Sequence, residues 1–183
     1  MKATLGDIVL EARELFREHG YDGASMQDLA ERVGLKKASL YTRFPSKEAL
    51  VPEVLAVTLD ETFAGLPRAD GDWRSDYAEI VERIAGSLTQ TKRCVGLHLA
   101  YGVSGETPEA RIAVEGFFTA HRDRIAAILA PGLGAEEAQA VAADTLARLE
   151  GATLWLATTG DARPMQRAVK ALVAAQAPAQ KPA

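Results

Sequence analysis

Cysteine is nearly absent from this sequence, with Cys94 alone among 183 residues. A single cysteine excludes a framework of internal disulfides and fits a protein of the reducing cytoplasm. No run of eighteen apolar residues occurs, so we expect no membrane span. The first residues do not read as a signal peptide, because Asp7 and Glu11 interrupt the apolar stretch that such a peptide needs.

Recognisable catalytic motifs are also missing. The sequence has no P-loop, no glycine motif for a dinucleotide, no HExxH and no candidate Ser-His-Asp set. His98 and His121 fall on different predicted helices, with no cysteine or carboxylate at ligand spacing, so they do not indicate a metal site. Cys94 could sense oxidants, but a buried and inert thiol is the simpler interpretation. We therefore expect neither an enzyme nor a bound cofactor.

Apolar residues at helical spacing, by contrast, occur along almost the whole sequence. Hydrophobic residues make up 48% of the chain and charged residues 25%, which is the balance of a globular protein. We predict an all-α protein with about nine helices. Their expected ranges are residues 4–20, 26–33, 36–43, 47–64, 73–88, 92–103, 108–130, 136–158 and 164–173.

Local signals mark the boundaries between these helices. Tyr21-Asp22-Gly23 is predicted to be a turn. Thr107 is placed to cap the helix that Pro108 begins, and Pro131 with its neighbouring glycines is expected to stop that helix. Pro52 lies inside the predicted helix 47–64, where it would delete one backbone hydrogen bond. The proline could be a tolerated local bend, or it could have a mechanical role. Residues 177–183 carry nothing to bury and are expected to be disordered.

Residues 25–44 form the clearest local pattern. Ser25 followed by Asp28 is typical of a helix N-terminus, and Gly34 can take the positive φ that ends such a helix and turns the chain. A second short helix is expected from Lys36 to Arg43. Two short helices joined by a glycine-containing turn predict a helix-turn-helix.

The same stretch carries a local excess of positive charge. No aspartate or glutamate occurs from residue 33 to residue 47, and the whole chain has a net charge of −4, so composition does not explain the excess. A basic face of this kind fits DNA phosphates, and the alternative is a solvated helix face. The basic residues are Arg32, Lys36, Lys37, Arg43 and Lys47.

The run from Ile8 to Leu50 resembles the DNA-binding domain of the TetR/AcrR family of transcriptional regulators. The resemblance implies a helix-turn-helix domain at residues 1–50, with the helix from residue 47 as a connector. It also implies a helical ligand-binding and dimerisation domain at residues 51–176. The matching pieces are Ala12–Phe16, Gly20–Ser25, Leu29–Leu35, Leu40-Tyr41 with Phe44, and Ser46–Leu50.

An α-helix fits the major groove of DNA, and the second helix of the motif reads the bases. Lys37 has a long donor that can reach guanine, Ala38 can approach a thymine methyl group, and Thr42 can do either. In the family, the residues that match Tyr41 and Lys47 hold phosphates, and Lys47 also precedes a helix N-terminus that suits an anion. The predicted DNA-contacting residues are Ser25, Lys36, Lys37, Ala38, Tyr41, Thr42, Arg43 and Lys47.

This sequence departs from the family pattern at three positions of the reading helix. Lys36 stands where a small hydroxyl residue commonly caps the helix, Ala38 where glycine is common, and Arg43 where histidine is frequent. These changes add charge and alter the reading surface. The operator sequence therefore cannot be taken from a relative.

The resemblance also implies a pocket for a small-molecule inducer in the second half of the chain. The helices at 92–103, 108–130 and 136–158 offer mostly apolar and aromatic side chains, which favours an uncharged or weakly polar ligand. Each of these side chains could equally be ordinary core. The candidates are Leu97, His98, Tyr101, Phe117, Phe118, His121 and Trp155.

The family pairs through its last two long helices, which correspond here to about residues 136–174. The first of these helices has a stripe rich in small residues, which would let another helix approach closely. The alternative is that this stripe is central core of a single chain. It consists of Ala138, Val141, Ala142, Thr145, Leu146, Leu149, Ala152 and Leu156.

Together these features predict a cytoplasmic, homodimeric transcriptional repressor. It would bind a palindromic DNA operator and be released by a small, mostly apolar ligand. The alternatives are a helical protein-binding module and an enzyme with no recognisable catalytic motif. The basic run and Tyr41 argue against the first alternative, and the missing motifs argue against the second.

Overall fold

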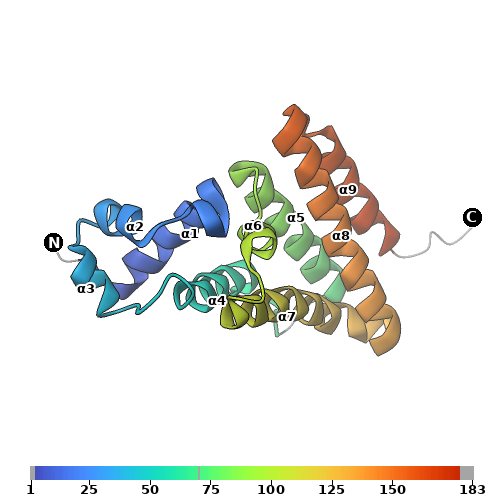
Figure 1. The fold of residues 1–183 in the computed structure, drawn as a ribbon. Coiled ribbons are helices and arrows are strands. Elements are labelled where there is room, and N and C mark those ends of the chain that lie inside the picture. The colour runs from blue at the N-terminus through green and yellow to red at the C-terminus, as the bar shows by residue number, and fades with distance from the viewer. Residues whose placement is uncertain (1–2, 70, 178–183) are drawn as a thin grey trace, which may run out of the picture. The chain divides into compact units, whose positions relative to one another are not determined.

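The computed structural model of the protein describes residues 3–69 and 71–177, so residues 178–183 of the predicted disordered tail lie outside the described residues. All regular secondary structure in these residues is helical, as the apolar spacing predicts (Figure 1). None of the described helices is both long and apolar enough to cross a membrane. The helices are α1 (Leu5–Gly23), α2 (Met26–Arg32), α3 (Lys37–Tyr41), α4 (Leu50–Phe63), α5 (Trp73–Thr91), α6 (Val95–Gly102), α7 (Pro108–Leu133), α8 (Ala135–Thr159) and α9 (Arg163–Ala175).

The helices form two compact units. The first unit contains the described residues up to Asp60 together with Cys94–Thr119, so it holds α1, α2, α3, most of α4, α6 and the beginning of α7. The second unit contains Glu61–Arg93 and the described residues from Ala120 onward, with α5, the rest of α7, α8 and α9. Packing thus groups α6 with the N-terminal helices. A functional boundary at residue 50 stays a prediction.

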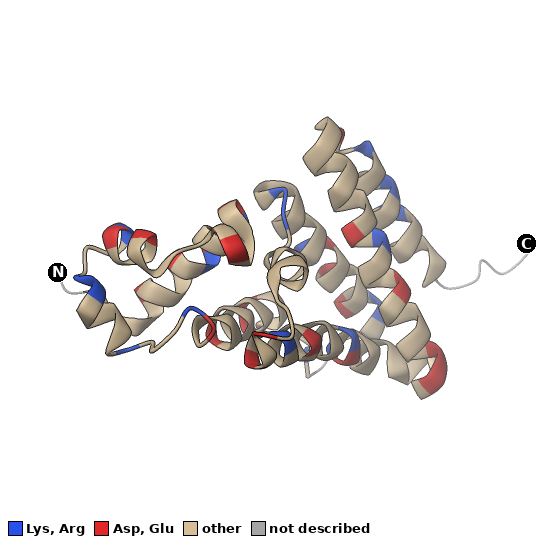
Figure 2. Ribbon diagram, in the orientation of Figure 1, with Lys and Arg blue, Asp and Glu red and all other residues tan. Residues whose placement is uncertain are grey.

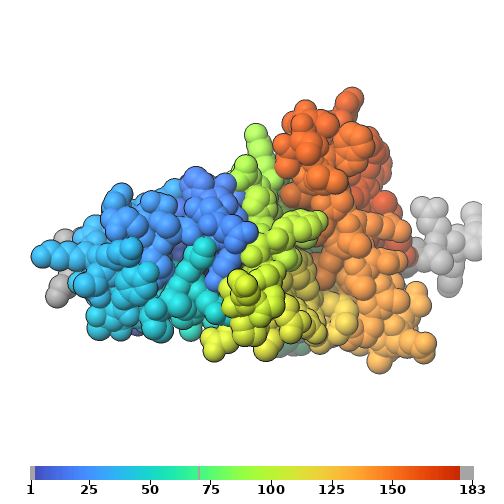
Figure 3. Space-filling model, viewed as in Figure 1, coloured from blue at the N-terminus to red at the C-terminus, as the bar shows by residue number. Residues whose placement is uncertain are grey.

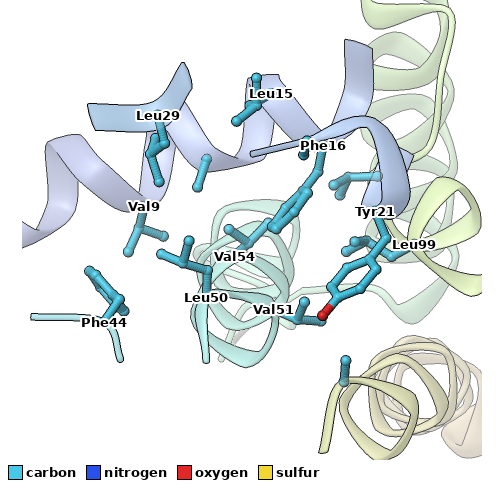
Figure 4. Packing of buried hydrophobic residues seen from close by; sticks show 14 of the residues in the cluster. Val9, Leu15, Phe16, Tyr21, Leu29, Phe44, Leu50, Val51, Val54 and Leu99 are labelled. Carbon is cyan, nitrogen blue, oxygen red and sulfur yellow. The ribbon is translucent and has the colours of Figure 1, made fainter. Parts of the chain in front are cut away.

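The core of the first unit is built around α1. Its apolar face buries Ile8 and Phe16 completely or nearly so, because these side chains recur on one side of the helix. Figure 4 shows Phe16 directed toward the side chains of α4, with Val54 beside it. α2 contacts α1, and α3 contacts α2. Other members of the core are Leu15, Leu29, Leu40, Leu50, Val51 and Leu99.

In the second unit, α5, α8 and α9 contact one another (Figure 1). Tyr77 is fully buried and its hydroxyl lies 2.7 Å from the hydroxyl of Thr145. Because the Thr145 hydroxyl donates to the Val141 carbonyl at 2.8 Å, Tyr77 is the donor in this pair. The interaction joins α5 to α8 inside the unit.

The small-residue stripe of α8, predicted as a dimer surface, is for the most part core of one chain. Thr145 bonds to α5, and its neighbours along the stripe are buried as well. Periodicity identified the apolar face, but the chain's own helices cover it. The buried members are Ala138, Ala142, Thr145, Leu149, Ala152 and Leu156.

α1 runs to Gly23, but its helical backbone is interrupted at Gly20, where the first helix was predicted to end. Gly20 has φ 68° and ψ −174°, a backbone conformation that strains residues with a side chain. After this kink the helix resumes through Gly23, so the prediction of a turn at Tyr21–Gly23 is wrong. The kink brings the buried Tyr21 ring within 6.1 Å of the Phe16 ring, centre to centre.

α4 begins at Leu50 rather than at Lys47, because residues 45–47 form a bend and residues 48–49 a turn. Ser46 still caps this segment, since its hydroxyl accepts the Ala49 amide at 3.1 Å. Pro52 consequently lies in the first turn of α4, where backbone N–H groups have no partner within the helix. The prediction that Pro52 deletes a helical hydrogen bond is therefore wrong, and the structure gives it no mechanical role.

Two further boundaries differ from the predictions. Lys92, with φ 57°, ends α5, and α6 therefore begins at Val95 instead of near residue 92. α7 continues through Pro131 to Leu133, and Gly134 with φ 80° follows it. The stretch expected to stop this helix does end it, but at Gly134, which takes the positive φ, and not at Pro131.

Candidate nucleic-acid interface

The helix-turn-helix lies where the sequence predicts it. Ser25 Oγ accepts a backbone N–H at 3.1 Å and begins α2, and Gly34 has φ 65° and reverses the chain. The Leu35 amide donates to the Ala30 carbonyl at 2.8 Å and closes the end of α2. Leu40 is fully buried and anchors the inner side of α3. These contacts leave the other side of α3 at the surface of the first unit (Figure 3).

The exposed side of α3 carries the side chains predicted to read bases. The Lys37 ammonium lies 5.9 Å from the centre of the Tyr41 ring, one helical turn further on. The Thr42 hydroxyl donates to the Ala38 carbonyl at 3.0 Å, which leaves its methyl group and an oxygen lone pair for contact. The exposed residues of this helix and its two flanking positions are Lys36, Lys37, Ala38, Ser39, Tyr41 and Thr42.

Charge on this surface is positive around α3, and Figure 2 shows basic positions at its start. Arg32, which the sequence places in the basic group, forms an ion pair with Glu18. Its charge is therefore balanced within the chain. Ser39 is also exposed, between Lys37 and Tyr41, and is not among the predicted contacts.

Ser25 and Arg43, which are also predicted DNA contacts, have partners inside the chain. Ser25 uses its oxygen as the cap of α2, and its hydroxyl proton remains able to bond to a phosphate. Arg43 is half-buried, and its Nη1 donates to the Ala3 carbonyl at 2.7 Å. A guanidinium group has several N–H donors, so this contact does not exhaust it. DNA contact by both residues stays a prediction.

Lys47 is held by the end of α1. Its Nζ donates to the Tyr21 carbonyl at 2.5 Å and the Ala24 carbonyl at 3.0 Å, and it lies 4.2 Å from the centre of the Tyr21 ring. Burial lowers the pKa of Lys47, and the nearby Asp22 carboxylate opposes that shift. An ammonium group has three N–H donors, so one remains for a phosphate. The phosphate contact stays a prediction, beside a structural role that the sequence did not reveal.

The predicted ligand-binding residues divide between the two units. In the first unit, the rings of Phe117 and Phe118 meet edge to face with centres 5.4 Å apart. α6 packs closely on them, since a Cβ on Gly96 would lie 2.5 Å from the Phe117 ring. Tyr101, in contrast, is 84% exposed. The residues of this set in the first unit are Leu97, His98, Tyr101, Phe117 and Phe118.

His121 and Trp155 belong to the second unit. His121 is buried, with its ring 5.5 Å from the Phe63 ring, whereas Trp155 is 57% exposed on α8. Contact of any of the seven residues with a ligand stays a prediction. Among the described residues, no three His, Cys, Asp or Glu side chains gather in a way that could hold a metal ion.

The second unit has an apolar groove of about 870 Å³ between α5 and α9. None of the seven predicted ligand-binding residues lines this groove. Sequence reasoning missed it because its walls come from two helices far apart in the chain. Its apolar lining includes Ala85, Met165, Val169 and Val173.

Comparison with known proteins gives one family along the chain. Residues 8–54 match the family described as bacterial regulatory proteins, tetR family. Residues 76–171, a little more than half of the chain, match the family described as transcriptional regulator LmrA/YxaF-like, C-terminal domain. The tetracycline repressor protein class A from transposon 1721 of Escherichia coli is 39% identical over 69 residues, which are 37% of this chain and only 32% of that repressor.

Solved structures share the fold over nearly the whole chain. A TetR transcriptional regulator from Legionella pneumophila has a TM-score of 0.80 and 21% identity, over 94% of this chain and 97% of that chain. The transcriptional regulator FadR from Bacillus subtilis in complex with stearoyl-CoA has a TM-score of 0.74 and 14% identity, over 93% of this chain and 98% of that chain. At these identities the likeness concerns the fold.

Replacing Lys47 by alanine tests its role at the end of α1. The substitution leaves the Tyr21 and Ala24 carbonyls without this donor, so we expect the free energy of unfolding to fall by about 1–3 kcal/mol in urea denaturation. The control is Lys36→Ala, at an exposed lysine whose side chain makes no cap bond, which should change it by less than about 0.5 kcal/mol. Equally small changes in both variants would contradict the structural role.

Proposed function

Because the chain belongs to the TetR family of transcriptional regulators, we propose that it is a homodimeric repressor that binds a palindromic operator. A small, mostly apolar ligand would release it from DNA. The observation that carries the proposal is the positive charge on the exposed side of α3. Lys36 and Lys37 lie at the start of this helix, in a stretch without carboxylates, although the whole chain has a net charge of −4. The family makes the protein a transcription regulator rather than an enzyme.

The proposed division of labour follows from the geometry of α3. Lys37, Ala38 and Thr42 are exposed there and have the chemistry for base edges in the major groove. Tyr41 and Lys36 lie at the surface around them and would hold phosphates, which position the helix without reading sequence. Further phosphate contacts would come from Ser25, Arg43 and Lys47. Each of these side chains has a donor that its hydrogen bonds within the chain do not use.

We propose that two copies pair through the outward sides of α8 and α9. The inward side of α8 is occupied within the chain, so pairing needs the opposite side, where Ala147, Gly151 and Leu154 are exposed at helical spacing. Ala171 and Ala175 are exposed on α9. Small residues let helices of two copies approach closely, and Leu154 offers an apolar anchor that is 63% exposed in the single chain.

Two features support the proposed ligand: the apolar and aromatic side chains of the candidate residues, and a groove large enough for a small molecule. α6 and α7 supply the apolar and aromatic candidates, and the groove between α5 and α9 has a volume within the range of small-molecule sites, about 300–1,000 Å³. A relative of the same fold is known in complex with stearoyl-CoA. A ligand would change DNA affinity only as far as it prefers one conformation of the protein over another.

Two lysines at the start of α3 should respond differently to alanine substitution. Lys37→Ala should relax sequence preference at one base pair of each half-site, because a base contact is lost. Lys36→Ala should weaken binding to all duplexes alike and reduce the dependence of affinity on salt, because a phosphate contact is lost. Selection of duplexes from randomised DNA, followed by titration at several salt concentrations, measures both effects. Unchanged base preference in Lys37→Ala would remove it as a reader.

Dimerisation through α8 is tested by a charge at Leu154. We expect a solution mass about twice 19.5 kDa for the protein at micromolar concentration, and about 19.5 kDa for Leu154→Lys, because a buried charge in an interface lacks a partner. Ile112→Lys on α7 is the matched control, since Ile112 is 62% exposed, and it should remain dimeric. A dimeric Leu154→Lys would place the interface elsewhere.

A further inference from the structure

The first turn of α7 is capped by a side chain from a distant part of the sequence. Glu48 Oε1 accepts the Glu109 amide at 2.9 Å and the Ala110 amide at 3.1 Å. These are two of the backbone N–H groups that an α-helix leaves without an internal partner at its start. A carboxylate there also meets the positive end of the helix dipole. Glu48 therefore binds the N-terminus of α7 in the way that an N-cap residue usually does.

The local residue expected to cap α7 is engaged elsewhere. Thr107 Oγ1 accepts the Ser104 amide at 2.9 Å and donates to the Ser104 carbonyl at 3.3 Å. The prediction that Thr107 caps this helix is therefore wrong, because its hydroxyl closes the preceding turn. The first amides of α7 depend on Glu48 instead.

Glu48 is adjacent in sequence to Lys47, which holds the end of α1. In the junction between α3 and α4, Lys47 thus donates to carbonyls at the end of α1, and Glu48 accepts from amides at the start of α7. Buried Phe44 and Leu50 flank this junction on both sides. The segment that directly follows the reading helix is consequently fixed to α1 and to α7 within the first unit.

We propose that Glu48 is a positioning residue for DNA reading, whose bond to the start of α7 holds the α3–α4 junction in the arrangement that lets α3 engage the operator. The proposal rests on the function proposed above. α7 is continuous from Pro108 to Leu133 and carries Phe117, Phe118 and His121 further along. A displacement of its first turn would break the bond to Glu48 and lower operator affinity, which gives a route for regulation.

The test compares Glu48→Ala and Glu48→Gln with Glu53→Ala and Glu53→Gln. Glu53 is exposed in the first turn of α4, so the matched variants lose the same charge close by in the chain. Two quantities are measured for each variant. One is affinity for a duplex selected by the unmodified protein and for a scrambled duplex of equal length. The other is hydrogen exchange at the amides of Glu109 and Ala110.

We expect Glu48→Ala to lose about tenfold in affinity for the selected duplex, which corresponds to the loss of one helix cap. Glu48→Gln should lie between Glu48→Ala and the unmodified protein, because an amide oxygen still accepts but carries no charge. Exchange at Glu109 and Ala110 should accelerate in the Glu48 variants and not in the Glu53 variants. Removing a negative charge should by itself favour DNA, so a selective loss cannot come from net charge.

The inference is overturned if Glu48→Ala has the same affinity as Glu53→Ala for the selected duplex and also for the scrambled duplex. This holds whether or not exchange at the start of α7 accelerates. Accelerated exchange with unchanged affinity would mean that the cap serves α7 alone. Glu48→Gln keeps the shape of the side chain and decides between the same outcomes if Glu48→Ala does not fold. If the unmodified protein selects no duplex at all, the proposed function fails, and that result is distinct from a failure of Glu48.

Discussion

Two adjacent side chains of opposite charge, Lys47 and Glu48, meet two helix ends of opposite polarity. The ammonium lies on the carbonyls that end α1, and the carboxylate lies on the amides that begin α7. Helix C-termini attract cations and helix N-termini attract anions, so each side chain satisfies backbone groups that the helices themselves leave open. The proposed control of α3 depends on this arrangement, because Lys47 and Glu48 lie in the segment that joins α3 to α4.

The helix-turn-helix could be predicted from the sequence because its signals are local. Ser25 caps its own helix, Gly34 turns the chain at its own position, and Leu40 faces inward by helical spacing alone. The cap of α7 could not, since its donor amides and its acceptor are 61 and 62 residues apart and a nearby hydroxyl offered a sufficient local explanation. The prediction for Pro52 was wrong because α4 begins at Leu50, three residues later than predicted, which places the proline in the first turn of the helix.

The second half of the chain shows where periodicity stops being informative. Apolar spacing identified the buried face of α8, but not that Tyr77 of α5, rather than a second copy, would meet it at Thr145. Residue type likewise suggested Tyr101 and Trp155 as pocket residues, yet both are largely exposed. Which surface covers an apolar side chain is decided by contacts between distant segments, and a single sequence carries no record of them.

Operator binding is tested directly by the affinity of the protein for a duplex selected from randomised DNA and for a scrambled duplex, over a range of salt concentrations. A homodimer with one reading helix in each copy should select a sequence with two-fold symmetry, with half-sites about one helical turn apart or a multiple of it. Binding to that sequence should be tighter than binding to the scrambled duplex by about a thousandfold or more, and the affinity should fall as salt rises. Equal affinity for the two duplexes at every salt concentration would rule out sequence-specific operator binding.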